Sequence, residues 1–293
     1  MSSIVYKALR WSGVAWLWRE VAQRRKVTFL LFHDMVVTDA ERNFAYLKRH
    51  YNIISLNDYL DAVRNEKRLP PKAVVITFDD GHVSNYALLP VIKRMQIPVT
   101  IFLCTSIVGT RRHFWFRHSE EMKPKVEALK KLSNGQRLDA LRQYGFEQEQ
   151  EYGDMQALSK EQIDEMKPRV NFQSHTCFHP ILPQCDSTTA EREIKGSKRQ
   201  LAESLGLTVN ALSYPNGDYS ERDIRLAQTA GYDCGVTVDS GYNDINTDLF
   251  RLKRFSVNDA KNTTELMVKA SGCYALLKQW MHKPSYGFKT THE

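Results

Sequence analysis

The chain has 293 residues, of which 42% are hydrophobic and 26% are charged, and its formal net charge is +7. This balance is typical of a globular protein with a sizeable core, and it excludes a disordered chain, a collagen-like repeat and a disulfide scaffold. The apolar runs are shorter than the roughly 18 residues that a membrane-spanning helix needs.

The excess positive charge belongs to the N-terminal segment. Residues 1–26 contain six Lys and Arg residues against Glu20 alone, so they account for +5 of the net charge. Residues 27–293 therefore carry only +2, whereas a nucleic-acid-binding protein usually has basic charge over its folded body. We expect no nucleic-acid partner.

Cysteine spacing and the first residues bear on the cellular location. The five cysteines include no CxxC pair, so neither a zinc ribbon nor a disulfide framework is indicated. The N-terminus lacks a clean apolar core followed by a small-residue cleavage site, so no signal peptide is predicted. We expect a reducing, cytoplasmic location.

Residues 5–26 are predicted to form one amphipathic helix. Apolar residues recur on one face with a helical period, and basic residues flank that face, with Trp11, Trp16 and Trp18 adding amphipathic rings. Two interpretations stay open. The helix packs on the outside of the domain, or it lies on anionic lipid at the inner face of the membrane.

From residue 27 onward, short β-branched and aromatic runs alternate with segments of helical period. The alternation predicts βα units and a parallel sheet, and seven strands suit a barrel better than a two-domain wound sheet. The predicted strands are 27–32, 73–78, 99–104, 170–173, 211–214, 234–238 and 252–257. The predicted helices are 39–50, 57–65, 84–95, 159–166, 188–205 and 220–230.

The interval 105–168 is too long for one crossover connection. Its charge-rich stretches 120–132 and 136–143 predict extra helices inserted beside the barrel mouth. We therefore expect a single catalytic domain over residues 27–293, which includes this insertion and C-terminal helices, preceded by the basic helix within residues 1–26.

Chemically active side chains follow two of the predicted strands. Asp79 and Asp80 come directly after one of them, and adjacent carboxylates are tolerated where a cation binds one and leaves the other free as a base. His175 and His179 follow another strand at a spacing that allows both to share one ion. Two histidines and one carboxylate are typical of a catalytic metal site.

Two further strand ends carry polar groups. Asn216 lies in a Tyr-Pro-Asn-Gly turn, and His33 ends the first strand. Taken alone, each has an ordinary structural interpretation, as a plain turn or a hydrogen-bonded histidine. All four motifs, however, lie at the carboxyl ends of predicted parallel strands, where barrel active sites assemble. The joint interpretation is a metal-dependent hydrolase.

The first two motifs resemble those of a known family. Thr-Phe-Asp-Asp-Gly at 77–81 and His-Thr-Cys-Phe-His at 175–179 are similar to the motifs of polysaccharide deacetylases of the NodB-homology type, carbohydrate esterase family 4. The resemblance covers residues 27–257 and implies a distorted (β/α)7 barrel. It also implies removal of an acetyl group from an N-acetylated sugar, within a glycan or on a lipid or nucleotide carrier, during bacterial surface-glycan synthesis.

The resemblance further implies a role for each residue of these motifs. Asp80, His175 and His179 would hold a divalent ion, usually Zn²⁺, although such a donor set also accepts Co²⁺, Ni²⁺ or Fe²⁺. Asp79 would be the general base that takes a proton from the attacking water.

The third motif departs from the family pattern. Ser213 stands where an arginine is expected, and Asn216 stands where a tyrosine is expected. The backbone N–H of Asn216 can still bind an oxyanion, because a main-chain group does not depend on the side chain. Arg254 is similar to an arginine found late in a subgroup of the family and can compensate beside Asp79.

The proton donor has two candidates. The late histidine motif of typical family members is not evident after residue 240. In the surface-glycan subgroup an N-terminal strand end supplies that role, and His33 resembles it, so His33 is the expected general acid and His82 its competitor. Two other functions stay open, an amidohydrolase for a small non-sugar amide and a glycan-binding pseudoenzyme.

Overall fold

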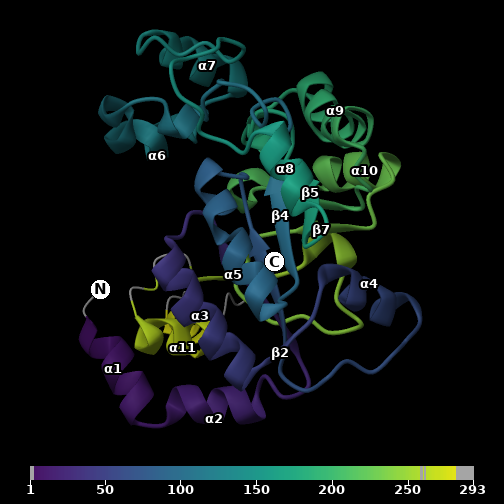
Figure 1. Cartoon of the computed structure of the whole chain (residues 1–293). Coiled ribbons are helices and arrows are strands. Elements are labelled where there is room, and N and C mark those ends of the chain that lie inside the picture. Colours follow the sequence, from purple (N-terminus) through teal and green to yellow (C-terminus); the bar gives the residue numbers. More distant parts are fainter. Residues whose placement is uncertain (1–2, 258–259, 261, 282–293) are drawn as a thin grey trace, which may run out of the picture.

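The computed structural model describes residues 3–257, 260 and 262–281. Its centre is a parallel sheet with the strand order β7-β6-β5-β4-β3-β1-β8, and β2 pairs with β3 beside this path. Helices surround the sheet (Figure 1), so the predicted distorted (β/α)7 barrel is confirmed. The strands are β1 (Val27–Phe32), β2 (Asn52–Ile53), β3 (Ala73–Phe78), β4 (Val99–Leu103), β5 (Val170–Ser174), β6 (Ala211–Ser213), β7 (Cys234–Val236) and β8 (Phe255–Ser256).

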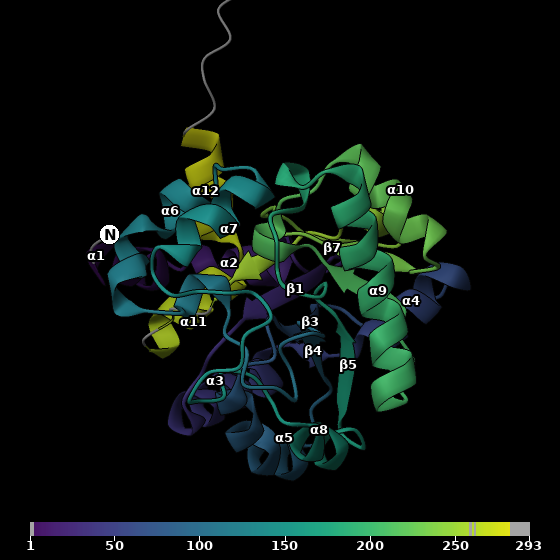
Figure 2. The same cartoon turned by 90° about the horizontal axis from the view of Figure 1, so that it is seen from above.

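The predicted helices between the strands are present with small shifts of their ends. Most of them ring the sheet when the molecule is viewed from above (Figure 2). Residues 83–88 form a 3-10 helix that leads into α5, so that predicted helix changes type part-way. The helices are α3 (Val37–His50), α4 (Leu56–Arg64), α5 (Leu89–Met95), α8 (Lys160–Met166), α9 (Ser187–Leu205) and α10 (Glu221–Thr229), followed by α11 (Thr263–Ala270) and α12 (Cys273–Met281).

The last predicted strand, 252–257, links the two ends of the sheet. Leu252 forms a parallel bridge with Val236 of β7, and Phe255 and Ser256 pair with β1. The regular ladder is therefore shorter than predicted, because the segment changes its partner part-way along.

Alternation along the strands decides which side chains face the barrel interior. One buried cluster lies inside the barrel and is closed by α4, while a larger cluster lies between the sheet and helices such as α3, α5 and α9. Since side chains alternate with a period of two, positions 33 and 79 face the same way as the interior residues before them. The interior cluster includes Val27, Phe29, Ala73, Val75, Phe102, Val236 and Leu252.

The single helix predicted over residues 5–26 is wrong in its continuity. The chain forms α1 (Ser3–Trp11) and α2 (Val14–Val21), separated at Gly13, whose φ of 76° lies in the left-handed region that interrupts a helix. Ala15 packs with Val268 and Cys273, so these helices lie against α11 and α12. Within the described residues, no helix combines the length and apolarity needed to cross a bilayer.

The insertion contains the expected helices, but the first is mostly not α-helical. Residues 120–125 form a 3-10 helix that contains Pro124, and only α6 (Val126–Leu129) follows it. Proline removes a backbone donor and clashes with the preceding turn, which explains the break. The second is α7 (Asn134–Arg142). The division into residues 1–26 and one domain over 27–293 stays a prediction.

Candidate metal and catalytic site

A cavity of about 430 Å³ opens at the carboxyl ends of the strands. Six of the seven residues singled out from the sequence line it, and the seventh, Arg254, reaches it through Asp79. The barrel therefore assembles side chains from the ends of four strands, β1, β3, β5 and β6, together with Arg254 just before β8. The six lining residues are His33, Asp79, Asp80, His175, His179 and Asn216.

Asp80, His175 and His179 form a buried group of metal-ligand type. Their ligand atoms lie within 4.8 Å of one another. The Nε2 atoms of His175 and His179 are 3.4 and 3.5 Å from Oδ1 of Asp80. A tetrahedral ion with bonds of about 2.0–2.1 Å holds its donors roughly 3.3 Å apart, so this spacing fits a divalent cation.

The hydrogen bonds around the three residues leave lone pairs facing one another. Nδ1 of His175 lies 2.8 Å from the carbonyl oxygen of Ser213, which only accepts, so this nitrogen carries a proton. In a neutral imidazole Nε2 then presents a lone pair to Oδ1 of Asp80, and that oxygen has no hydrogen-bond partner among the described residues. Buried lone pairs in contact need a positive charge between them, which a cation supplies.

The pKa shifts agree with a site that attracts positive charge. Burial alone would raise the pKa of Asp80, but the adjacent imidazoles of His175 and His82 outweigh burial and hold it well below its usual range. Burial opposes charge on His175, yet the neighbouring carboxylates outweigh burial and raise its pKa. Burial lowers the pKa of His179 to about 3, so this imidazole is neutral and able to act as a ligand.

Asp79 is held by a different set of partners. Nη1 and Nη2 of Arg254 donate to its two carboxylate oxygens at 2.8 and 2.7 Å, and the hydroxyl of Ser213 donates to Oδ2 at 3.1 Å. Burial raises the pKa of Asp79, but the charges of Arg254 and His175 outweigh it and keep that pKa below its ordinary value. Ser213, which stands where the family pattern has an arginine, and Arg254 thus both bind the carboxylate of Asp79.

The two histidine candidates for the proton donor lie in different places. His33 lines the cavity and is half-buried, and burial lowers its pKa. His82 is buried behind Asp80, with its Nε2 2.9 Å from Oδ2 of that residue. Nη1 of Arg117 lies 3.0 Å from Nδ1 of His82, and because a guanidinium only donates, the proton of His82 is on Nε2 and points to Asp80. His82 thus orients the carboxylate of Asp80.

The loops at the site use unusual backbone conformations. Seven non-glycine residues of the described chain have positive φ, and four of them belong to the site loops. Such conformations cost free energy and persist only where the surroundings enforce them. Gly81 also has positive φ, and a Cβ there would lie 2.5 Å from the side chain of Leu103. The four residues are Asp80 (72°), Thr176 (66°), His179 (57°) and Asn216 (58°).

Two supporting residues were missed by the sequence reasoning. Glu193 of α9 is buried and accepts hydrogen bonds from the backbone N–H groups of Cys177 and Phe178. Trp115 of the insertion donates from Nε1 to the carbonyl oxygen of His179 at 2.8 Å. Both act on the loop between the two histidines, and neither stands in a motif, so only the folded chain identifies them.

The insertion also supplies a wall of the cavity. The ring of Phe116 lies with its centroid 4.8 Å from that of His179. Val126 and Lys130, from α6 and the residue after it, line the cavity as well. An aromatic ring and a basic side chain beside the donor set make a surface suited to a sugar ring with polar substituents.

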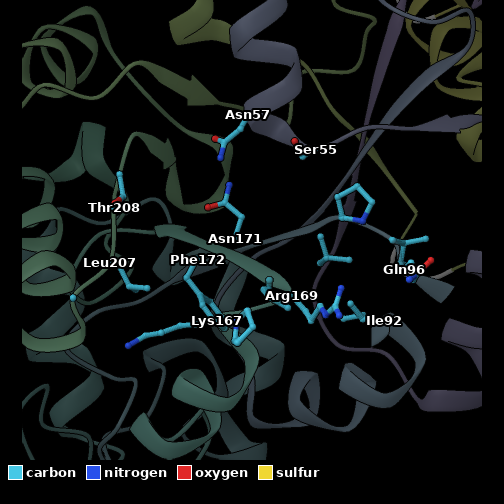
Figure 3. Close-up of a pocket in the computed structure, with 16 residues that line it drawn as sticks. Ser55, Asn57, Ile92, Gln96, Lys167, Arg169, Asn171, Phe172, Leu207 and Thr208 are labelled. Atoms are coloured by element: carbon cyan, nitrogen blue, oxygen red, sulfur yellow. The ribbon is translucent and has the colours of Figure 1, made fainter. Parts of the chain in front are cut away.

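A second, larger hollow lies elsewhere. An open groove of about 590 Å³ runs past the amino ends of β4 and β5 (Figure 3). Active sites of barrel enzymes lie at the opposite, carboxyl ends, and none of the residues singled out from the sequence lines this groove. Its lining includes Ser55, Asn57, Lys167, Arg169, Asn171 and Thr208.

Comparison with known proteins agrees with the geometry. A family model described as polysaccharide deacetylase matches residues 66–235. The chain is 24% identical over 259 residues to a poly-beta-1,6-N-acetyl-D-glucosamine N-deacetylase of Staphylococcus epidermidis, an alignment that covers 83% of this chain and 72% of the relative.

Two solved structures are similar in fold. The deacetylase PplD of Streptococcus pyogenes, in complex with acetate, has a TM-score of 0.62 at 21% identity. The superposition covers 84% of this chain and 99% of the PplD chain. IcaB from Ammonifex degensii has a TM-score of 0.62 at 19% identity, and the superposition covers 85% of this chain and 98% of the IcaB chain. At such identities the likeness shows a shared fold.

Proposed function

This chain belongs to the polysaccharide deacetylase family and is a sugar deacetylase, and from that premise we propose that it hydrolyses the acetamido group of an N-acetylated sugar in a bacterial surface glycan. The observation that carries the proposal is that the two adjacent carboxylates, Asp79 and Asp80, have different partners. Arg254 pairs with Asp79, while Oδ1 of Asp80 faces only the two imidazoles. One carboxylate is thus arranged as a base and the other as a ligand.

We propose Asp80, His175 and His179 as the ligands of a divalent cation, with Zn²⁺ as the first choice and Co²⁺, Ni²⁺ or Fe²⁺ as alternatives. The ligand spacing and the unpartnered Oδ1 of Asp80 support this assignment. When bound, such an ion supplies Lewis acidity, which polarises the acetyl carbonyl and acidifies the attacking water.

The remaining residues have complementary roles in the proposal. Asp79 accepts the proton of the attacking water, and Arg254 keeps its carboxylate ionised and aimed at the cavity. The backbone N–H of Asn216 binds the oxyanion, an interaction typically worth a factor of about 100–1000 in rate. His33 donates a proton to the departing amine, which is otherwise a poor leaving group.

The substrate in this proposal is an N-acetylhexosamine unit. The Staphylococcus epidermidis relative is named for poly-beta-1,6-N-acetyl-D-glucosamine, and the wall formed by Phe116 and Lys130 can hold a sugar ring. The unit belongs to a polymer or an oligosaccharide, or it is attached to a lipid or nucleotide carrier. We propose a cytoplasmic protein that is peripheral to the inner face of the membrane.

Acetate release from a substrate panel tests this function. The panel contains β-1,6-linked N-acetylglucosamine oligomers, a nucleotide-linked N-acetylhexosamine, an O-acetylated glycan and a small non-sugar amide, and the metal content of the same preparation is measured. We expect acetate from at least one N-acetylated sugar and about one divalent ion per chain. Folded, metal-loaded protein that hydrolyses only the non-sugar amide, or nothing, would contradict the proposal.

A further inference from the structure

The outer face of α1 and α2 is unusually apolar. Six of the ten large apolar side chains classed as exposed in the described residues lie between positions 4 and 21. We call them the N-terminal surface, and a concentration of exposed apolar side chains usually marks an interaction site. They are Ile4, Val5, Trp11, Trp16, Leu17 and Val21, with exposed fractions of 72, 37, 81, 53, 55 and 67%.

The core of the protein does not use this surface. The opposite face of the two helices already packs on α11 and α12, and the rings of Tyr6 and Tyr274 lie 5.2 Å apart. The side chains of Ile4 and Trp11, and those of Leu17 and Val21, recur at helical spacing on the outer side. Both helices therefore carry apolar side chains on two faces. One face packs on α11 and α12, and the other is exposed to solvent.

Basic residues stand among and just after the apolar side chains in the sequence. Lys7, Arg24 and Arg25 are exposed, and none of them forms an ion pair within the part of the chain that the structure describes. The only acidic residue in the segment, Glu20, is already paired with Arg19 and Lys72. The charge near this surface thus complements a negatively charged partner.

We propose that the N-terminal surface docks the protein on an anionic lipid bilayer. Exposed Trp, Leu and Ile side chains enter the boundary between headgroups and acyl chains, and Lys and Arg bind anionic headgroups. Tryptophan is favoured at that boundary because its ring is apolar and its N–H is polar.

Docking in this way fixes the orientation of the barrel. The end of α2 lies just before β1, at the amino ends of the strands, and the cavity lies at their carboxyl ends. In the view of Figure 1, α1 and α2 lie at the opposite end of the molecule from α6 and α7, whose segment walls the cavity. A six-residue strand spans roughly 20 Å, so the docked protein holds its cavity about that far from the lipid. The cavity then faces glycan that lies away from the bilayer, a consequence that rests on the proposed function.

Vesicle flotation of the full chain tests the docking. We compare phosphatidylcholine vesicles with vesicles that also contain phosphatidylglycerol, at low and high salt. Two variants probe the surface, Trp11→Ser/Trp16→Ser/Leu17→Ser and Lys7→Glu/Arg24→Glu/Arg25→Glu. The matched controls carry three changes of the same kind on other exposed positions, Val36→Ser/Val83→Ser/Ile245→Ser and Arg169→Glu/Arg199→Glu/Arg225→Glu. Because all these side chains are exposed, the fold should survive, and thermal unfolding checks that it does.

We expect binding only to the phosphatidylglycerol vesicles, weakened by salt because screening shortens the reach of surface charge. Each basic residue removed should lower the partition coefficient about fivefold, the apolar variant should stay in solution, and both controls should bind like the parent. Absence of binding at low salt, or equal losses in the controls, would overturn the proposal. Dimerisation that depends on Trp11 and Trp16, without vesicle binding, would assign the surface to a second copy. Acetate release from soluble glycan is measured separately and does not depend on docking, so the vesicle results leave the test of the proposed function unchanged.

Discussion

Arg254 and Asp79 are 175 positions apart in the chain and form a two-pronged ion pair inside the barrel, with N–O distances of 2.8 and 2.7 Å. The side chain of Arg254 is inaccessible to solvent, and that of Asp79 is 4% exposed. The guanidinium also donates from Nε to the carbonyl oxygen of Thr237 and from Nη2 to the hydroxyl of Ser213. Such a network holds Asp79 ionised and fixes its direction.

Removing one member of this pair should cost much more than removing both. Arg254→Met leaves the buried carboxylate without its ion-pair partner, which typically costs about 3–5 kcal/mol of folding free energy. The double variant Asp79→Asn/Arg254→Met removes the charge as well and should recover a large part of that loss. Denaturant unfolding of the parent, both single variants and the double variant measures the coupling. Additive effects would show that the pair is not energetically linked.

The two aspartates should respond differently to substitution. His179→Ala and Asp80→Asn remove ligands and should lower the metal content, whereas Asp79→Asn should retain the metal and lose most of kcat because it removes a base. Metal analysis and steady-state kinetics on the same preparations separate the two effects. Chelation should abolish activity, and added Zn²⁺ should restore it. Equal metal loss in Asp79→Asn and Asp80→Asn would contradict the assignment.

His33→Ala should bind metal normally and lose roughly 100- to 10,000-fold in kcat, the usual range for one acid–base group. Burial holds the pKa of His33 below its ordinary value near 6.5. The proton needed by the leaving amine is therefore lost as the pH rises through that lowered pKa, and this alkaline decline should vanish in the variant.

His82→Ala is the comparison for His33, because His82 contacts Asp80 instead of the cavity. Its loss should weaken metal binding about 10- to 100-fold, as expected for a residue that orients a ligand, and excess metal should restore turnover. A large loss of kcat in saturating metal for His82→Ala, with near-normal turnover in His33→Ala, would reverse the two roles.

Trp115→Phe tests the contribution of the insertion to the metal site. The change keeps an aromatic ring but removes the N–H that donates to the carbonyl oxygen of His179. We expect about a tenfold weaker metal affinity, measured by competition with a chelator. Trp16→Phe, at an exposed position, is the control. A lower melting temperature with unchanged metal affinity would assign Trp115 a purely structural role.

The sequence by itself determined the strands and the residues that end them. Asp79 and His175 follow runs of β-branched and aromatic residues, and the period-two alternation of a strand is local, so it is readable without knowing the neighbours. The parallel order then required these strand ends to meet at one face. The barrel and the meeting of these strand ends at one face could therefore be predicted, whereas the choice of Asp80 as the ligand beside the two histidines came from the family resemblance.

Only the tertiary structure decided which distant side chains support these groups and where local patterns fail. The resemblance already implied Arg254 beside Asp79, but its two-pronged contact with that carboxylate, and the contact of Trp115 with His179, depend on packing between distant segments that no local period records. Gly13 divides the N-terminal helix because a left-handed residue interrupts the hydrogen-bond ladder. The structure also places His33 at the cavity and His82 against Asp80, directions that the motifs do not record, and the role of His33 as the acid stays a prediction.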